Sequence, residues 1–399
     1  MGASFLAVER DEKNSEGGAV AGRNIASIQR QLTICYRNLD ELEERRAKFG
    51  INAPIDLINQ IHDLRDEIAQ LEAVLAGHDK PEALSPESAS TVDARRQQAA
   101  IETLSERDWD SLLRRIKDGN CTPFIGPEVC QDVIPRGSDI ARAWAEEHVY
   151  PLSDADNLPR VAQFLATSRD PAFPAESLAG YLQGLEARPN FRDGNEPHSF
   201  LASLPLPIYI TTNYDEFMVQ ALKYRLRQPT QEVCRWNDYV RDIPSAFDPG
   251  ANVEVSPANP VVFHLFGHTN VPEAMVLTED DYLDFLVRVS RRPEIIPSPI
   301  QKALVKSSLL FIGYQLHDFR FRVLFRGLIA SLERSLRRTR VAVQIAPEPA
   351  ALDSITEDHV RWYLEDYFAK DDVRVYWGNS FDFISELRQR WEDFIGHDA

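Results

Sequence analysis

Apolar residues recur along residues 24–76 with alternating spacings of three and four, which place them on one side of a helix. The first series consists of Ile28, Leu32, Cys35, Leu39 and Leu42, and the second of Leu57, Ile61, Leu64, Ile68, Leu71 and Leu75. Between the two series, residues 48–54 contain Gly50 and Pro54, which supply a helix stop and a helix start. Two helices with such narrow apolar seams predict an antiparallel, coiled-coil-like helical hairpin.

The segments around this hairpin have different compositions. Residues 1–23 are polar and Gly-rich, which predicts a disordered leader, and residues 77–97 are rich in Pro and Ser, which predicts a linker. A hairpin of this size buries little apolar surface by itself. We therefore expect its remaining apolar surface to bind a protein partner or a second hairpin in a homo-oligomer; docking on the chain's own main domain is the alternative.

From residue 98 to residue 399, short apolar runs rich in β-branched and aromatic residues alternate with helical stretches. The runs are Cys121–Ile125, Pro207–Thr212, Val261–Phe266, Ser308–Ile312, Val341–Ile345 and Val373–Trp377. Nearly uniform apolar runs are typical of strands buried on both faces of a parallel sheet. The segments between them are long enough for crossover helices, so we predict an α/β domain with a doubly wound, mainly parallel sheet.

Charge and composition exclude several classes of function. The chain has 62 acidic and 44 basic residues, a net charge of −18, which argues against a nucleic-acid partner. No apolar run approaches the roughly 18 residues of a membrane span and no signal peptide is present, so we expect a cytoplasmic protein without a membrane partner. The four cysteines form no CxxC pair, which argues against a zinc site and a disulfide framework.

Polar residues and glycines follow four of the predicted strands. They lie in residues 125–130, 211–215, 267–270 and 313–318. Ligands of open parallel sheets bind beyond the carboxyl ends of the strands, and Gly, Asn, His and Asp suit close backbone approach and hydrogen bonding there. Turn chemistry would explain any one of these segments, but four together predict a ligand site. The acidic segment 278–281 instead predicts a helix start, capped by Thr278, rather than a metal site.

Taken in order, these segments resemble the SIR2-like domains of bacterial antiphage defence proteins. The matching motifs are Phe124-Ile125-Gly126, Thr211-Thr212-Asn213-Tyr214-Asp215, Phe266-Gly267, Phe311-Ile312-Gly313-Tyr314 and the tail from Arg374 to Ser380. The hairpin is similar to effector-associated helical modules. The SIR2-like resemblance covers roughly residues 110–395, and it implies that the domain binds NAD in a Rossmann-like cleft. Because the zinc-binding module of the sirtuin deacylases is absent, it favours NAD hydrolysis over deacylation.

The resemblance also implies roles for individual residues. Asn213 matches the asparagine that holds the reacting ribose and the attacking nucleophile, and a carboxamide can donate and accept at once; a strand-end turn is the alternative. Asp215 would line the same pocket, or cap the following helix. Gly126, Thr212 and Gly267 fall in the nucleotide-binding motifs. Gly313, Tyr314 and His317 match the loop that the family places near the adenosine half; for His317, a surface position is the alternative.

Two departures from the family pattern bear on the chemistry. The first loop reads Gly126-Pro127-Glu128, and the carboxylate of Glu128 would repel a diphosphate unless it turns outward or the nucleotide sits differently. Phe266 stands where the family has its catalytic histidine. On a continuous strand, His264 would face the same side as Phe266, whereas His268 follows the strand end. Either could serve as general base, and we prefer His268.

Three functions follow from these residues. The first is an NAD-hydrolysing effector of a bacterial defence system, activated through a partner or oligomerisation. The second is a non-catalytic sensor of NAD or an ADP-ribose derivative, which Phe266 and Glu128 favour. The third is an inactive interaction adaptor in which Phe266, Glu128 and Pro127 fill the cleft.

Overall fold

The computed structural model describes residues 104–130, 133–251, 253–316, 318–325, 328, 340–344, 357–369 and 371–396. The predicted leader, helical hairpin and linker of residues 1–97 lie outside these residues. Within the described part of the chain, no helix is long and apolar enough to cross a membrane.

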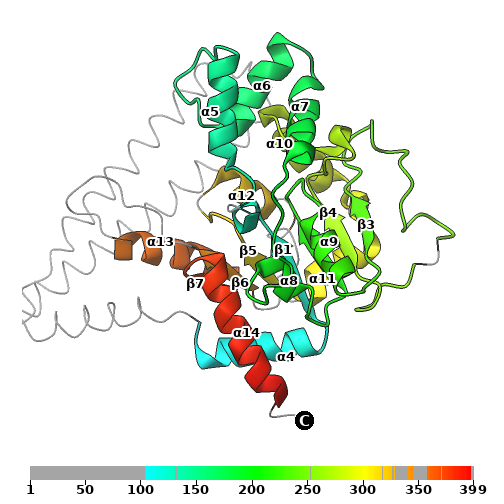
Figure 1. Ribbon diagram of the computed structural model, residues 1–399, viewed down its shortest axis with the longest axis vertical. Coiled ribbons are helices and arrows are strands. Elements are labelled where there is room, and N and C mark those ends of the chain that lie inside the picture. The colour runs from blue at the N-terminus through cyan, green and yellow to red at the C-terminus, as the bar shows by residue number, and fades with distance from the viewer. Residues whose placement is uncertain are drawn as a thin grey trace, which may run out of the picture. The chain divides into compact units, whose positions relative to one another are not determined.

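A seven-stranded sheet with the order β3-β4-β2-β1-β5-β6-β7 forms the centre of the domain, and all of its strand pairs are parallel (Figure 1). The strands are β1 (Cys121–Ile125), β2 (Ile208–Thr211), β3 (Thr230–Val233), β4 (Val261–His264), β5 (Ser308–Ile312), β6 (Arg340–Gln344) and β7 (Val373–Trp377). The chain adds β2, β3 and β4 on one side of β1, then returns to add β5, β6 and β7 on the other. The predicted doubly wound, Rossmann-like parallel sheet is therefore confirmed, and its switch point lies at β1.

Helices cover both faces of the sheet, because alternate strand residues face opposite sides. Phe124, Ile210, Phe263 and Phe311 share one apolar core with helices α10 (Glu279–Arg291), α11 (Ser298–Lys306), α12 (Phe319–Leu324) and α13 (Glu357–Ala369). Ile125, Tyr209, Val262 and Leu310 share the opposite core with helices α4 (Glu106–Lys117), α8 (Pro197–Leu201), α9 (Phe217–Tyr224) and α14 (Ser380–Gly396).

Local sequence signals explain where several helices begin. Ser105 caps α4 through a capping box with Asp108, and the helix then buries Trp109, Leu112, Leu113 and Ile116 at helical spacing. The predicted helix start at Thr278 is confirmed, since Thr278 and Asp281 form a capping box at the start of α10. The acidic segment 278–281 is thus accounted for by a helix N-terminus.

A third group of helices, α5 (Gly137–Glu147), α6 (Leu158–Ser168) and α7 (Phe173–Gly184), forms a small core of its own with Met275 and Leu277. These helices lie together beyond one end of the sheet (Figure 1). The starts of α5 and α6 and two leucines of α7 line the cavity at the carboxyl ends of the strands. This helical layer therefore forms the outer wall of the candidate site.

The largest differences between the predicted runs and the observed strands are at β4 and β3. The run Val261–Phe266 forms a strand only as far as His264, because residues 265–266 turn. β3 was not predicted, because its sequence, Thr-Gln-Glu-Val, is an edge strand without an apolar run.

Candidate functional site

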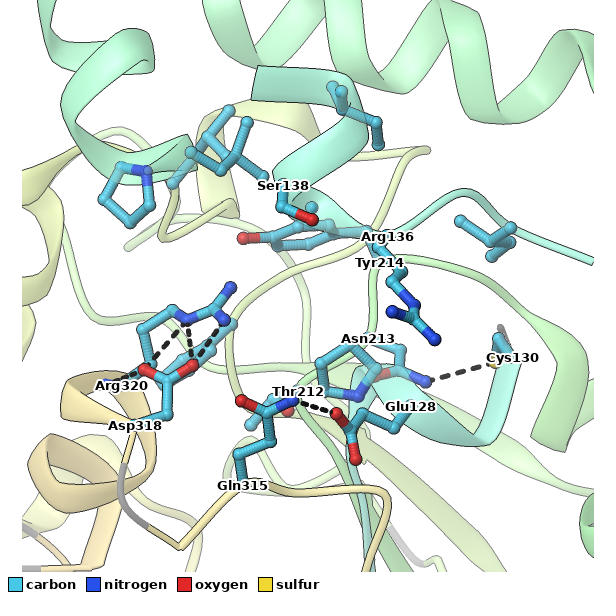
Figure 2. Close-up of a pocket in the computed structure, with 18 of the residues that line it drawn as sticks. Glu128, Cys130, Arg136, Ser138, Thr212, Asn213, Tyr214, Gln315, Asp318 and Arg320 are labelled. Carbon is cyan, nitrogen blue, oxygen red and sulfur yellow. Dashed lines mark hydrogen bonds and ion pairs between the residues drawn. The ribbon is translucent and has the colours of Figure 1, made fainter. Parts of the chain in front are cut away.

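A cavity of about 470 Å³ lies at the carboxyl ends of β1, β2 and β5, where the sheet changes direction (Figure 2). Its floor comes from the loops that follow these strands, and its outer wall from the beginnings of α5 and α6. Small-molecule sites usually occupy about 300–1,000 Å³, and open α/β sheets bind ligands at this switch point. The position and volume of the cavity both suit a nucleotide-sized ligand.

Glycines allow the β1 and β5 loops to approach each other beneath this cavity. A Cβ on Gly126 would lie 2.4 Å from the carbonyl oxygen of Gly313. Gly313 has φ +78°, and a Cβ there would lie 2.5 Å from Cγ2 of Val129. The backbone N–H of Glu128 donates to the Gly313 carbonyl at 3.0 Å, which ties the two loops together. Any larger residue at Gly126 or Gly313 would have to separate them.

The end of β2 carries the polar floor of the cavity. The hydroxyl of Thr212 lies 3.0 Å from the hydroxyl of Tyr314, which donates to the carbonyl of Ile125 at 3.2 Å. The backbone N–H of Asn213 donates to the side chain of Thr211 at 3.0 Å. Asn213 is 6% exposed and its Nδ2 donates to Sγ of Cys130 at 3.4 Å, whereas its Oδ1 is buried and has no partner among the described residues. An unpartnered buried acceptor on a cavity floor is suited to bind a ligand hydroxyl.

Below Asn213 lies a group of side chains that we call the thiol network: Cys130, Asp215, His198 and Glu196. The thiol of Cys130 donates to Oδ2 of Asp215 at 3.5 Å and lies 3.8 Å from Nε2 of His198. The other ring nitrogen of His198 contacts Glu196 at 2.6 Å. Burial raises the pKa of the Cys130 thiol well above its usual range, and the adjacent Asp215 carboxyl adds to this effect, so the sulfur keeps its proton at neutral pH.

Asp215 lies between the cavity and the start of α9. It lines the cavity, and its Oδ1 accepts from the backbone N–H of Phe217 at the start of α9, at 2.8 Å. Burial raises the pKa of Asp215, although the nearby His198 partly opposes this shift. The side chain therefore anchors α9 with one oxygen and the thiol network with the other.

The opposite wall carries two arginines, together with the carboxylates of Asp156 and Glu279. Arg136 precedes the first residue of α5 and Ser138 lies in its first turn; both line the cavity (Figure 2). The first amides of a helix lack intrahelical partners and favour anions. Arg320 lines the same cavity and pairs with Asp318. Burial alone would lower the pKa of Arg320, but its hydrogen bonds to Asp318 raise it.

Glu128 lies on the rim of this cavity, at the side of the β5 loop. Its carboxylate accepts a hydrogen bond from Nε2 of Gln315 (Figure 2). The side chain is partly exposed. Glu128 therefore does not plug the cavity, although its charge remains close to any bound anion.

The two candidate histidines do not line the cavity. β4 ends at His264, and the N–H of Gly267 turns back to the His264 carbonyl at 3.4 Å. The expectation that His264 and Phe266 face the same side is therefore wrong, because strand alternation stops at the turn. Phe266 lines the cavity and packs edge-on against Tyr282 and Phe285 with ring centroids 5.4 and 5.2 Å away.

His264 and His268 instead pack against each other, with ring centroids 4.9 Å apart. Nδ1 of His264 lies 3.4 Å from the Asn213 carbonyl oxygen. Burial and the neighbouring His268 lower the pKa of His264 to about 3. Burial also lowers the pKa of His268, whose Nδ1 accepts from the backbone N–H of Asn270 at 3.0 Å. Their catalytic role stays a prediction.

The structure brings most of the predicted ligand-binding residues together. The predicted residues that line the cavity are Thr212, Asn213, Asp215, Gly313 and Tyr314. Gly126 supports its floor without lining it. Gly267 does not line the cavity either, and a Cβ there would meet the backbone of Ala274 at 2.4 Å. His317 is outside the described residues.

Sequence reasoning missed Arg136, Ser138 and Arg320, as well as the three members of the thiol network other than Asp215. Arg136 and Ser138 lie at the start of α5, just before its apolar residues, and Asp318 caps α12. Helix-start signals in the sequence could therefore have indicated these wall residues. In the sequence, Cys130 is distinguished only as one of four scattered cysteines. Nothing in the sequence indicates that His198, which is 68 positions away from Cys130, contacts the Cys130 thiol.

Part of the chain is similar in sequence to known proteins. Residues 207–371, which contain Asn213 and β4, match the SIR2-like domain family. The chain is 26% identical over 208 residues to the NAD(+) hydrolase ThsA of Bacillus cereus (strain MSX-D12). That match covers 51% of this chain and 40% of ThsA, so the chain spans about two fifths of the length of this relative.

A solved structure, "Structural Basis for the Mechanism and Regulation of Sir2 Enzymes", also matches. It is 8% identical, with a TM-score of 0.35, over 73% of this chain and 100% of the solved chain.

Proposed function

We propose that this chain, which carries a SIR2-like domain, hydrolyses NAD to nicotinamide and ADP-ribose. The observation that carries the proposal is the cavity at the switch point of the sheet, on whose floor Oδ1 of Asn213 is buried without a partner among the described residues. A buried acceptor in a nucleotide-sized cavity suits a ribose hydroxyl or an attacking water. Similarity to an NAD hydrolase supports the same chemistry.

In the proposed reaction, the bond between C1′ of the ribose and the pyridinium nitrogen of NAD breaks. Nicotinamide leaves with the bonding electron pair and becomes neutral, and the ribose carbon acquires oxocarbenium character. A water molecule forms the new C1′–O bond and then loses its proton to solvent. Because nicotinamide leaves without protonation, and because neutral water can attack a carbon with oxocarbenium character, the reaction does not require a histidine in the place of Phe266.

Asn213 has the central role in this proposal. Its Oδ1 accepts a hydrogen bond from a ribose hydroxyl or from the attacking water, which orients the two reacting partners. The diphosphate is expected at the opposite wall, where Arg136 and the first turn of α5 favour an anion. Glu128 weakens this attraction, but its hydrogen bond to Gln315 keeps its carboxylate at the rim.

The direct test follows nicotinamide release from NAD by the purified full chain at high protein concentration. Wild-type protein should release nicotinamide, and Asn213→Ala should lower kcat about 100- to 1,000-fold, as for loss of a group that acts in the transition state. The exposed Asn190→Ala serves as the matched control. No release by the wild type, despite measurable binding of ADP-ribose, would contradict hydrolysis.

That outcome would favour the second function, a sensor that binds NAD or an ADP-ribose derivative without turnover. The observation in its favour is that Phe266 lines the cavity and that, among the described residues, no histidine does. Calorimetric titration with ADP-ribose distinguishes this sensor from an adaptor that binds no nucleotide.

We also propose that the enzyme acts in antiphage defence and that the helical hairpin of residues 24–76 couples it to a partner or to self-assembly. The similarity to ThsA and the apolar seams of the predicted hairpin support this. Leu32→Asp and Leu64→Asp should lower the oligomer mass measured by light scattering. Glu43→Ala, outside the seams, is the control, and an unchanged mass in all three variants would contradict the proposal.

A further inference from the structure

The side-chain amide of Asn213 can be oriented in two ways. Its oxygen and nitrogen have nearly the same shape, so the hydrogen-bond partners decide which atom contacts Cys130 and which atom is left for a ligand. In the structure, Nδ2 points to Sγ of Cys130 at 3.4 Å, and Oδ1 is left without a partner among the described residues (Figure 2). The proposed hydrolysis needs this orientation, because it depends on an acceptor.

The single proton of the Cys130 thiol determines this choice. Oδ2 of Asp215 lies 3.5 Å from the sulfur in a partly buried environment, and a carboxylate is a stronger acceptor than an amide oxygen. If the thiol donates to Asp215, its lone pairs remain to accept from Nδ2 of Asn213. In the reversed orientation, the thiol proton would go to Oδ1 of Asn213 and leave Oδ2 of Asp215 without its donor, which is costly inside a protein.

Glu196 and His198 hold the far side of the thiol. Glu196 accepts from the backbone N–H of Ser199 through Oε2 and contacts Nδ1 of His198 through Oε1, both at 2.6 Å. Burial by itself would raise the pKa of Glu196, but its hydrogen bond with His198 lowers it overall. The ring is 1% exposed and its Nε2 lies 3.8 Å from Sγ of Cys130, so the sulfur has little freedom to move.

We propose that the thiol network positions Asn213: a directed chain of hydrogen bonds, from Asn213 through Cys130 to Asp215, fixes Oδ1 toward the cavity. Cys130 is a positioning residue, supported by the Glu196–His198 pair, and it forms no bond with the substrate. This inference rests on the proposed NAD hydrolysis for its consequence in turnover. The orientation of the amide, however, can be measured without turnover.

The test compares Cys130→Ser, which keeps a donor and an acceptor, with Cys130→Ala, which has neither. Cys130→Ala should lower kcat about 10- to 100-fold and change KM for NAD less than about threefold, whereas Cys130→Ser should retain most of the turnover. Cys234→Ala, which removes another buried thiol far along the chain, is the control. Thermal unfolding of each variant reports whether it folds.

The second readout is the side-chain amide signal of Asn213 in ¹⁵N spectra, assigned by its loss in Asn213→Asp. Its NH₂ protons should be protected from exchange in the wild type and Cys130→Ser, and unprotected in Cys130→Ala. Equal protection in all three proteins would overturn the inference, as would equal losses of turnover in the two Cys130 variants. A stoichiometric zinc ion on Cys130, His198 and Asp215 in the purified protein would also overturn it.

If the wild type releases no nicotinamide but shows this protection pattern, the proposed function fails and the positioning of Asn213 stands. If turnover is present and the pattern is absent, the proposed function stands and the positioning fails.

Discussion

The ends of β2 and β4 lie side by side in the sheet, yet they contribute opposite chemistry to the cavity. Thr211 pairs with His264 across the two strands. After Thr211, the backbone N–H of Thr212 still donates to the Ile125 carbonyl of β1 at 3.1 Å. The next residue, Asn213, lines the cavity. Beyond His264, the chain turns at once and presents Phe266. The conformation of the first two residues after a strand therefore decides which side chains reach the ligand.

The largest expected difference between these strand ends is in turnover. Asn213→Ala should lower kcat about 100- to 1,000-fold, whereas His268→Gln should change it less than about threefold, because the His268 ring does not line the cavity. Steady-state nicotinamide release measures both. An equal loss in His268→Gln would restore this histidine as the general base and remove the contrast between β2 and β4.

The second difference concerns backbone packing under the cavity. Gly126→Ala would place a methyl group 2.4 Å from the Gly313 carbonyl oxygen, so we expect a loss of about 2–3 kcal/mol in the free energy of unfolding. Gly180→Ala, in α7 with nothing within 4 Å, should instead stabilise the protein by about 0.5–1 kcal/mol. Urea denaturation compares the two, and similar midpoints would show that the β1 and β5 loops can separate easily.

Acid should destabilise the β4 end through His264. Burial lowers the pKa of His264 to about 3, so below pH 6.5 the unfolded chain binds a proton that the folded protein does not. His264 therefore lowers the free energy of unfolding as pH falls from 6.5 toward 3, by at most about 1.4 kcal/mol per pH unit.

His264→Gln should flatten this dependence. Urea midpoints measured between pH 6.5 and pH 5 test it, since most carboxyl groups stay ionised in that range. A slope identical to that of the wild type would show that His264 is hydrated in solution.

The smallest effect is expected at the wall opposite both strand ends. Arg136→Gln should weaken binding of ADP-ribose about tenfold, because one cation near a diphosphate contributes on the order of 1–2 kcal/mol. The difference from wild type should shrink at high salt, as for a partly exposed charge. Lys223→Gln, on α9, is the control in the calorimetric titration. An unchanged affinity at low salt would place the diphosphate elsewhere.

The sequence predicted the sheet better than the site, for physical reasons. Uniform apolar runs mark buried parallel strands, so the bounds of β1, β5 and β7 agree with the predicted runs. The ends of the strands can also be predicted, because polar residues and glycines follow the apolar runs. Asn213 and Gly313 were identified as candidate site residues for this reason. The edge strand β3 lacks an apolar run, and the turn after His264 depends on tertiary hydrogen bonds.

The thiol network could not be predicted from spacing. Cys130, His198 and Asp215 come from three separate segments, and their contact depends on how the loop after β1 and helix α8 pack at the carboxyl edge. The strand-end motifs identify residues at the carboxyl edge of the sheet, such as Asn213. They do not identify the side chains of Cys130 and His198, which lie next to Asn213 or support its neighbours.

Binding of the ribose of NAD against Asn213 can be seen in a crystal structure of the full chain with ADP-ribose. We expect a ribose hydroxyl within hydrogen-bond distance, about 2.5–3.2 Å, of Oδ1 of Asn213, with the diphosphate at the start of α5. Nucleotide bound outside this cavity, or ribose facing Phe266 with Oδ1 still unpartnered, would contradict it.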